Sequence, residues 1–293
     1  MAGVAVMAVS ALAAGATALS ASAATPSATG YYVTSATGGV FGFGGAVVYG
    51  SPAASQISLG SKIVGMAETS TGKGYWLVGA DGGVFTYGDA GYFGSVPAVT
   101  TKKLVAPVVA MSSTSTGKGY WLVGGDGGVF AFGDAGYYGS LESLHVKPAA
   151  PIVGIAPTPT GKGYWLVGAD GGVFAFGDAV FWGADATPSA PVVGIAATTD
   201  GGGYWVVSND GAVTRFGDAL FYGSTLTTGV VPTAPIVTMA VTPDGKGYWL
   251  LGADGGVFTF GDAGYFGSVP AELAAGGVTL TAPITAVGLA STH

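Results

Sequence analysis

Apolar runs of four to six residues recur along most of this chain, separated by short clusters of Gly, Asp, Ser and Thr. Residues 161–179, GKGYWLVGADGGVFAFGDA, show the pattern, and close copies begin at Gly72, Gly117, Gly201 and Gly245. A more divergent copy opens the series, and the second aromatic residues of all copies are Tyr32, Trp76, Trp121, Trp165, Trp205 and Trp249. Their steps of 44, 45, 44, 40 and 44 residues indicate one supersecondary unit that is repeated and stacked.

Residues 150–184 serve as the model unit. A first strand, IVGIAPT, follows Pro151, and a turn around 160–163 leads into a second strand, YWLVGA. Asp170-Gly171 predicts a tight hairpin turn before the third strand, VFAF, because Gly accepts positive φ angles. A second turn, Gly-Asp-Ala, precedes a short fourth strand, VFWGA. Four antiparallel strands in about 44 residues are typical of one blade of a β-propeller.

The strands are apolar at nearly every position, which distinguishes a propeller from a plain sandwich. A strand with one wet face alternates apolar and polar residues, whereas a strand covered on both faces does not. Each propeller blade has a neighbour on either side. The small residues Gly154 and Ala156 suit a first strand that lies close to the axis, with the larger aromatic residues further out.

The two ends of the repeat region predict how the ring is completed. Five units begin with a first strand, at Lys62, Pro107, Pro151, Pro191 and Pro235, but the unit at Gly30 has none. Residues 281–292, TAPITAVGLAST, resemble the missing strand. We therefore predict an all-β, six-bladed β-propeller of four-stranded blades over residues 30–293, closed by the C-terminal strand and without exposed edge strands.

The blades are joined by segments of unequal length, which should share one rim because each leads from an outer strand to the next inner strand. They are rich in Ser, Thr, Ala, Val and Pro, and comprise residues 51–60, 95–105, 140–149, 184–189, 224–233 and 268–281.

The N-terminal residues have the pattern of an export signal. Residues 1–23 are small and apolar and end in Ala-Ser-Ala, which predicts a secretory signal peptide, and residues 24–29 form a short linker. An uncleaved membrane anchor is the alternative. The prediction is an extracellular or cell-surface protein with no stable membrane insertion after cleavage.

Composition and charge exclude several classes of function. The net charge is −7, with eight Lys and the single Arg215, so no basic stripe is available for nucleic acid or anionic lipid. The chain has no Cys and only His145 and His293, which excludes thiolate and multi-histidine metal centres. We predict no cofactor, no metal and a monomer.

The signature GKGYWLVGADGGVFxFGDAxFYGS, seen here in Tyr75-Trp76, Asp81-Gly82 and Tyr87-Gly88-Asp89, resembles repeat modules of secreted actinobacterial proteins. The resemblance covers residues 30–293 and implies export and a surface role, without catalytic residues. The first unit departs from it, with Tyr32, Thr37 and Gly45 in place of the Trp and the two Asp residues.

Ten of the sixteen carboxylates occupy two fixed positions of the repeat. We interpret both positions as turn residues whose carboxylate caps its own turn, although a ring of calcium or sugar ligands is the alternative for the first. The first set is Asp81, Asp126, Asp170, Asp210 and Asp254. The second set is Asp89, Asp134, Asp178, Asp218 and Asp262.

The adjacent Tyr and Trp of each unit point to opposite faces of a strand, and both faces should be packed between blades. We therefore favour a core position for them over a sugar-binding platform. Candidate ligand-binding residues are instead Glu142, His145, Lys147, Trp182 and Arg215.

The pattern favours an exported, non-catalytic module that binds a cell-envelope glycan or a protein through rim loops and strand-end aromatic residues. A hydrolase or lyase with its site at the channel mouth is the first alternative, because Glu142, His145 and Lys147 share one connecting segment. An exposed loop is the simpler interpretation of that trio. A purely structural surface protein is the second alternative.

Overall fold

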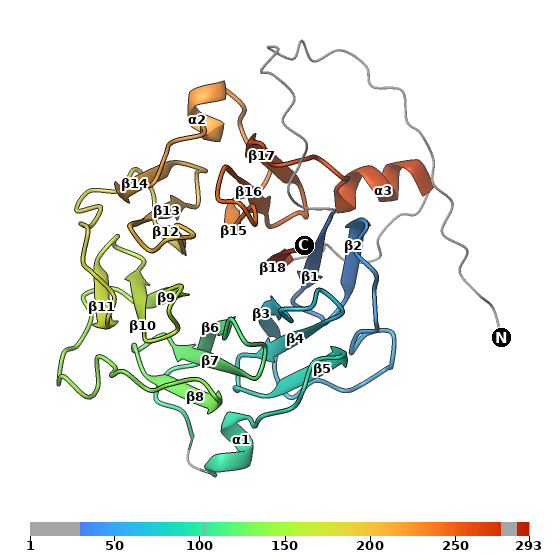
Figure 1. The fold of residues 1–293 in the computed structure, drawn as a ribbon. Coiled ribbons are helices and arrows are strands. Elements are labelled where there is room, and N and C mark those ends of the chain that lie inside the picture. The colour runs from blue at the N-terminus through green and yellow to red at the C-terminus, as the bar shows by residue number, and fades with distance from the viewer. Residues whose placement is uncertain (1–29, 102, 277–285, 293) are drawn as a thin grey trace.

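The computed structural model describes residues 30–101, 103–276 and 286–292, and these form six three-stranded antiparallel sheets. The sheets stand side by side around a common centre in a propeller-like arrangement (Figure 1). The all-β class predicted from the repeat is therefore confirmed. The predicted signal peptide (1–23) and linker (24–29) lie outside the described residues.

Each sheet has an inner, a middle and an outer strand. The inner strands are β18 (Ala286–Thr292), β3 (Ile63–Glu68), β6 (Val108–Ser113), β9 (Ile152–Pro157), β12 (Val192–Ala197) and β15 (Ile236–Val241). The middle strands, in the same order, are β1 (Gly30–Ser35), β4 (Gly74–Gly79), β7 (Gly119–Gly124), β10 (Gly163–Gly168), β13 (Gly203–Ser208) and β16 (Gly247–Gly252). The outer strands are β2 (Val40–Gly44), β5 (Val84–Gly88), β8 (Val129–Gly133), β11 (Val173–Gly177), β14 (Val213–Gly217) and β17 (Val257–Gly261).

The C-terminal strand β18 pairs with β1, which is the partner that the sequence analysis predicts for it. Leu289 lies opposite Val33, and the ladder has a bulge where Thr34 and Ser35 face Gly288 and Ala286. The other five sheets have a bulge at the same place, so β18 takes the register of an ordinary inner strand. Inner strands of neighbouring sheets contact one another all the way round the ring.

The hydrophobic core consists of six clusters, each between two neighbouring sheets. Every residue of the six middle strands is buried, because these strands have a sheet against both faces. This arrangement explains why the sequence shows unbroken apolar runs instead of alternation. Trp76 and Tyr120, for example, pack together between the second and third sheets, with ring centroids 5.7 Å apart.

The prediction of a fourth strand is wrong. After each outer strand the chain crosses the junction to the next sheet without joining a ladder, in segments that we call crossing segments: 47–50, 91–94, 136–139, 180–183, 220–223 and 264–267. Each ends in a Gly at positive φ, as at Gly94 (φ 135°), a conformation that departs from a regular strand. The outer strands therefore remain edge strands, which corrects the expectation that no edge would be exposed.

The connections that follow the crossing segments share one rim, as predicted. Their first residues lie beside the Asp-Gly hairpin turns, where the Val96 amide donates to Gly82 O at 3.1 Å and the Leu141 amide to Gly127 O at 3.2 Å. We call this side the connection rim and the opposite side, where loops join inner to middle strands, the loop rim. The connections contain helices that the sequence analysis did not predict, namely α1 (Val96–Val99), α2 (Thr225–Thr228) and α3 (Val269–Gly276).

Candidate functional site at the junctions between sheets

The repeated Tyr-Trp pair holds the crossing segments in place. In the second sheet Trp76 Nε1 donates to Gly91 O at 2.7 Å, on the segment that follows its own outer strand. From the third sheet Tyr120 donates its hydroxyl to Gly94 O at 2.5 Å and accepts from the Phe93 amide at 3.3 Å. Both side chains are completely buried, as the sequence predicts, so neither offers a surface to a ligand.

The same pair of bonds recurs around the ring and links the first sheet to the sixth. Tyr31 of the first sheet donates to Gly267 O of the sixth, and the Phe266 amide donates back to the Tyr31 hydroxyl at 3.4 Å. Burial is the main cause that raises the pKa of these hydroxyls, to about 12 for Tyr164. They are therefore uncharged donors over the physiological pH range.

Every crossing segment has an exposed apolar side chain at its second position, and Val47, Tyr49, Val180, Trp182 and Leu220 of these segments are exposed as well. The second residue of each segment is between 41% and 57% exposed, and the six residues are Val48, Tyr92, Tyr137, Phe181, Phe221 and Tyr265. The three tyrosines are fixed at their far end, because each hydroxyl bonds the Ser three residues on, at 3.0 Å for Tyr92 and Tyr137 and 3.2 Å for Tyr265. Five of the six sheets thus present an aromatic ring to solvent at one equivalent position.

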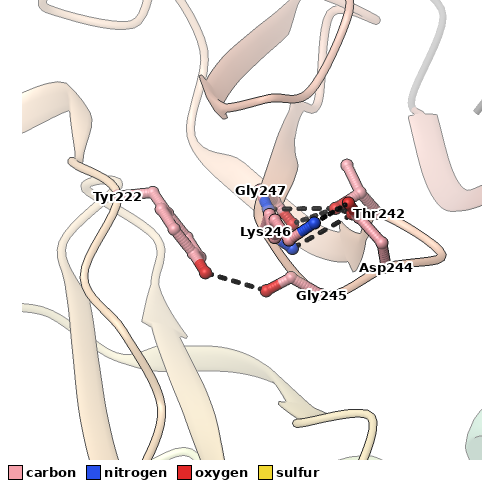
Figure 2. Close-up of polar contacts among 6 residues, drawn as sticks. All are labelled: Tyr222, Thr242, Asp244, Gly245, Lys246 and Gly247. Atoms are coloured by element: carbon pink, nitrogen blue, oxygen red, sulfur yellow. Dashed lines mark hydrogen bonds and ion pairs between the residues drawn. The ribbon is translucent and has the colours of Figure 1, made fainter. Parts of the chain in front are cut away.

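The third residue of the segment reaches over to the loop rim of the next sheet. Figure 2 shows Tyr222, from the fifth sheet, with its hydroxyl 2.9 Å from Gly245 O in a loop of the sixth. Tyr138 makes the same bond to Gly161 O at 2.8 Å, and Trp182 Nε1 lies 3.4 Å from Gly201 O. Each of these junctions therefore has an aromatic wall from one sheet and a polar loop from the next.

The loop in Figure 2 carries the polar groups of the junction. Lys246 Nζ lies 3.2 Å from an Asp244 carboxylate oxygen, and Thr242 donates to the same carboxylate at 3.0 Å. Burial raises the pKa of the Tyr222 hydroxyl, with further contributions from Asp262 and Asp244, while Lys246 lowers it. An aromatic ring, a carboxylate, an ammonium group and backbone carbonyls thus converge at one place.

The interpretation that the second Asp set caps its own turns is wrong for Asp89, Asp134 and Asp178, whose carboxylates hold the loops of the loop rim instead. In the second sheet Asp89 accepts from Thr69 at 2.9 Å and from Thr71. The third and fourth sheets repeat the arrangement with Asp134 and Asp178. In the fifth sheet Asp200 replaces the second Thr, and its charge, after burial, is the next cause that raises the pKa of Asp218.

The first Asp set lies in the hairpin turns of the connection rim. Asp81 Oδ1 accepts from the Gly83 amide at 3.0 Å, and the other four members accept from the corresponding amide at 2.9 to 3.1 Å. This is the geometry of a turn that is capped by its own carboxylate. Within the described residues no three His, Cys, Asp or Glu side chains gather as metal ligands.

The residues predicted to bind a ligand do not form one site. Glu142, His145 and Lys147 lie on an exposed turn of the connection rim, and in the described part of the chain no hydrogen bond joins their side chains. Trp182 lies in the crossing segment between the fourth and fifth sheets and is 40% exposed. Arg215, on β14, is exposed and lies 3.4 Å from Ala219 O.

Sequence reasoning missed the exposed aromatic position. The signal was present in the paired aromatic residues of the crossing segments, such as Tyr92-Phe93, since two adjacent residues of an extended segment point to opposite sides. At most one of the two can be buried at a junction, so at least one faces solvent, and in Phe181-Trp182 both do.

No protein-family model and no curated protein matches this chain. In the residues that the structure describes, no helix has the length and apolarity needed to cross a membrane.

Proposed function

We propose that the protein is an exported, non-catalytic binding module, a closed six-bladed propeller that holds uncharged cell-envelope glycans at the junctions between its sheets. The observation that carries the proposal is the solvent-exposed ring at one equivalent position of five sheets, exemplified by Tyr92, Tyr137 and Tyr265. Binding sites of small molecules combine aromatic walls with a few fixed polar groups. The junctions offer both.

Charge favours an uncharged glycan over an anionic polymer. The protein carries a net charge of −7, which opposes the approach of a polyanion. At the junction in Figure 2 the ammonium group of Lys246 is also paired with Asp244 at 3.2 Å, whereas Lys73, Lys118 and Lys162 at the equivalent position form no ion pair among the described residues. Sugar hydroxyls require only donors and acceptors, and the pyranose ring requires an apolar face such as Tyr137 or Phe181 presents.

The test measures stoichiometry. Isothermal titration of the full chain with chitotetraose, cellotetraose and mannotetraose, and sedimentation with purified peptidoglycan, should reveal several equal sites per chain. Single substitutions Tyr137→Ala and Phe181→Ala should each remove one site and leave the affinity of the others unchanged. The matched control is Val105→Ala, which removes an apolar side chain that is 93% exposed on a connection.

Two results would overturn the proposal. One is the absence of binding to every probe. The other is a single site per chain that survives Tyr137→Ala and Phe181→Ala but is lost in Glu142→Ala or His145→Ala, which would locate recognition on the connection rim and revive the enzyme alternative.

A further inference from the structure

The six inner strands surround the centre of the ring (Figure 1), and a cavity of about 750 Å³ lies between them. Its wall begins at the second residue of the inner strands, such as Val64 and Val193, and extends to the loops that follow them. The cavity opens on the loop rim, where the exposed residues Ser70, Ser115 and Thr199 border it. Its volume is in the range of sites for small organic molecules, and the opening provides a path of entry.

The inner strands present backbone groups to this cavity. Each is the last strand of its sheet, so it pairs with a middle strand along one edge only. In an antiparallel ladder, residues that bond the partner strand alternate with residues whose N–H and C=O point away from it. The Thr69 amide donates to Gly74 O at 2.9 Å, and the alternation from there directs the backbone groups of Glu68 and Met66 towards the cavity.

Every sheet places one such residue at the same level of the wall. It lies opposite the fourth residue of the middle strand, as Met66 lies opposite Leu77. These residues are Met66, Met111, Ile155, Ile195, Met239 and Leu289. Their side chains belong to the core clusters in the junctions, so it is their N–H and C=O groups that ring the cavity.

Few protein groups bond these inward backbone groups. Among the described residues, no backbone hydrogen bond joins one inner strand to another. Side chains reach some of the carbonyls, since the Ser113 hydroxyl donates to Glu68 O at 3.1 Å and the Thr238 hydroxyl lies 3.5 Å from Met239 O. Buried backbone groups of native proteins are nearly always paired, so the remaining ones require donors and acceptors from whatever fills the cavity.

No charged side chain faces the cavity from the part of its wall that the structure describes. Glu68 is the one titratable residue of that lining, and both its carboxyl oxygens are buried without a hydrogen-bond partner. They lie in the junction between the first and second sheets, close to Gly72, Tyr32 and Asp89. Glu68 therefore contributes its backbone to the wall and not its carboxyl group.

We propose that the central cavity binds one small, neutral, polyhydroxylated molecule, a sugar or polyol. A hydroxyl group both donates and accepts, so it matches a wall in which each inward residue offers one N–H and one C=O. A charged ligand would meet no side chain of opposite charge in this wall, so its desolvation would not be compensated. This site is distinct from the glycan sites proposed at the junctions and does not depend on them.

An extended peptide also carries donors and acceptors, but it fits the arrangement less well. A peptide strand pairs with the edge of one strand. The inward groups are instead distributed over six inner strands around the axis, as Met66 and Met239 illustrate. The hydroxyls of a sugar ring point in several directions and can reach more than one of these strands.

Methionine methyl groups provide local probes of the cavity. Met66, Met111 and Met239 line it, and the other two Met of the chain are Met1 and Met7, outside the described residues. The full chain with ¹³C-methyl methionine is titrated by NMR with glucose, glucosamine and glucuronate at pH 6, where the three pyranoses are neutral, cationic and anionic. We expect the three cavity signals to shift along one curve for a single glucose site, with at least tenfold weaker binding of both charged sugars.

Two substitutions reproduce a residue that the sixth sheet already has at the equivalent position, Thr238. A Cβ at Gly65 would lie 3.7 Å from the Met111 amide nitrogen, and one at Gly194 would lie 3.9 Å from the Met239 amide nitrogen. Both distances are ordinary contacts, so Gly65→Thr and Gly194→Thr should fold while their side chains cover an inward amide and narrow the cavity. Each variant should weaken glucose binding at least tenfold.

The control is Gly125→Thr, the same substitution in a turn of the connection rim, where no atom lies closer than 3.6 Å to the added Cβ. It should leave glucose binding unchanged. If either threonine variant folds poorly, Gly65→Ala replaces it, because Ala110 occupies this position in the third sheet, and it should still weaken binding.

Three results would overturn the proposal. They are the absence of any shift in the three methionine signals, equal affinity for glucose and a charged sugar, and unchanged glucose binding in both threonine variants. Tighter binding of N-acetyl-tetraalanine amide than of glucose would overturn it in favour of a peptide. The junction variants Tyr137→Ala and Phe181→Ala should leave the glucose curve unchanged, which separates failure of this site from failure of the junction sites.

Discussion

The first sheet and the other five reach the same register by different routes. In the five, a loop at the loop rim joins the inner to the middle strand, whereas β18 and β1 come from opposite ends of the described chain. The Asp that holds this loop in the second sheet, Asp89, has Gly45 as its counterpart in the first. The comparison shows that this carboxylate belongs to the loop, because it is absent where no loop joins the strands.

A second residue of the first sheet differs from the repeat but makes the same hydrogen bond. Tyr32 replaces the Trp, yet its hydroxyl donates to Val47 O at 2.9 Å, just as Trp165 Nε1 donates to Val180 O at 2.8 Å. The side chain changes, but the donor to the crossing segment does not. Each of these sheets therefore keeps a side-chain hydrogen bond to its crossing segment, the segment for which a fourth strand was predicted.

The largest effect is expected from removal of β18, the inner strand that the first sheet takes from the C-terminal part of the chain. A chain that ends at Gly276 lacks β18, so β1 loses its inner partner and the Tyr31–Val33–Leu289 cluster is opened. We expect a loss comparable with the stability of a whole domain, about 5–15 kcal/mol, and no cooperative transition in calorimetry. A peptide of residues 281–292 added in trans should restore the transition. A truncated chain that melts like the full one would show that the ring does not depend on β18.

The closing junction can be compared with an internal one through the Gly that ends each crossing segment. A Cβ at Gly267 (φ 133°) would lie 2.8 Å from Phe43, and one at Gly139 (φ 125°) 2.9 Å from Phe176. Gly267→Ala and Gly139→Ala should each lower the free energy of unfolding by about 3 kcal/mol, from backbone strain plus overpacking. Gly161→Ala is the control, because its φ of 68° is strained but nothing lies within 4 Å, so about 1 kcal/mol is expected in urea unfolding. Equal decreases in the free energy of unfolding for all three variants would mean that the junctions relax to accommodate the added methyl group.

The smallest effect concerns the junction between the first and second sheets, where Glu68 lies. Burial raises the pKa of Glu68 from 4.5 to about 8 in the folded protein, so between these values the folded state binds a proton that the unfolded state has released. The Glu68 contribution to stability is therefore complete below pH 4.5 and is lost as pH rises to about 8. Glu68→Gln should be more stable than the parent at pH 8 by about 1–3 kcal/mol and should lose this slope. Urea unfolding from pH 5 to 9 measures this pH dependence, and the exposed Glu142→Gln is the control for the loss of one carboxyl group on the surface.

Much of the architecture could be predicted from the chain because its determinants are local or periodic. The spacing of Trp76, Trp121 and Trp165 indicates the repeat, and unbroken apolar runs such as YWLVG indicate strands covered on both faces. The absence of a first strand before Gly30 indicates where residues 281–292 belong. The number of strands per sheet could not be predicted in this way, because VFWGA has the composition of a strand.

The candidate sites were harder to predict, because they depend on which sheet lies beside which. Nothing in the run Leu220-Phe221-Tyr222 says that Tyr222 reaches Gly245 while Phe221 faces solvent. The isolation of Glu68 is likewise visible only once its neighbours across the junction are known, since the absence of a hydrogen-bond partner is a property of three-dimensional surroundings.

The sequence by itself determined the period, the strand-forming runs, the Asp-Gly turns and the C-terminal strand that completes the first sheet, because these follow from side-chain patterning and backbone preference. Only the tertiary structure decided that the fourth segment crosses a junction. There the Trp nitrogen and the Tyr hydroxyl, contributed by two different sheets, take the carbonyls that a fourth strand would have used in a ladder. Whether a side-chain or a backbone donor bonds these carbonyls depends on which groups lie close together in the folded protein, and no local sequence pattern determines that.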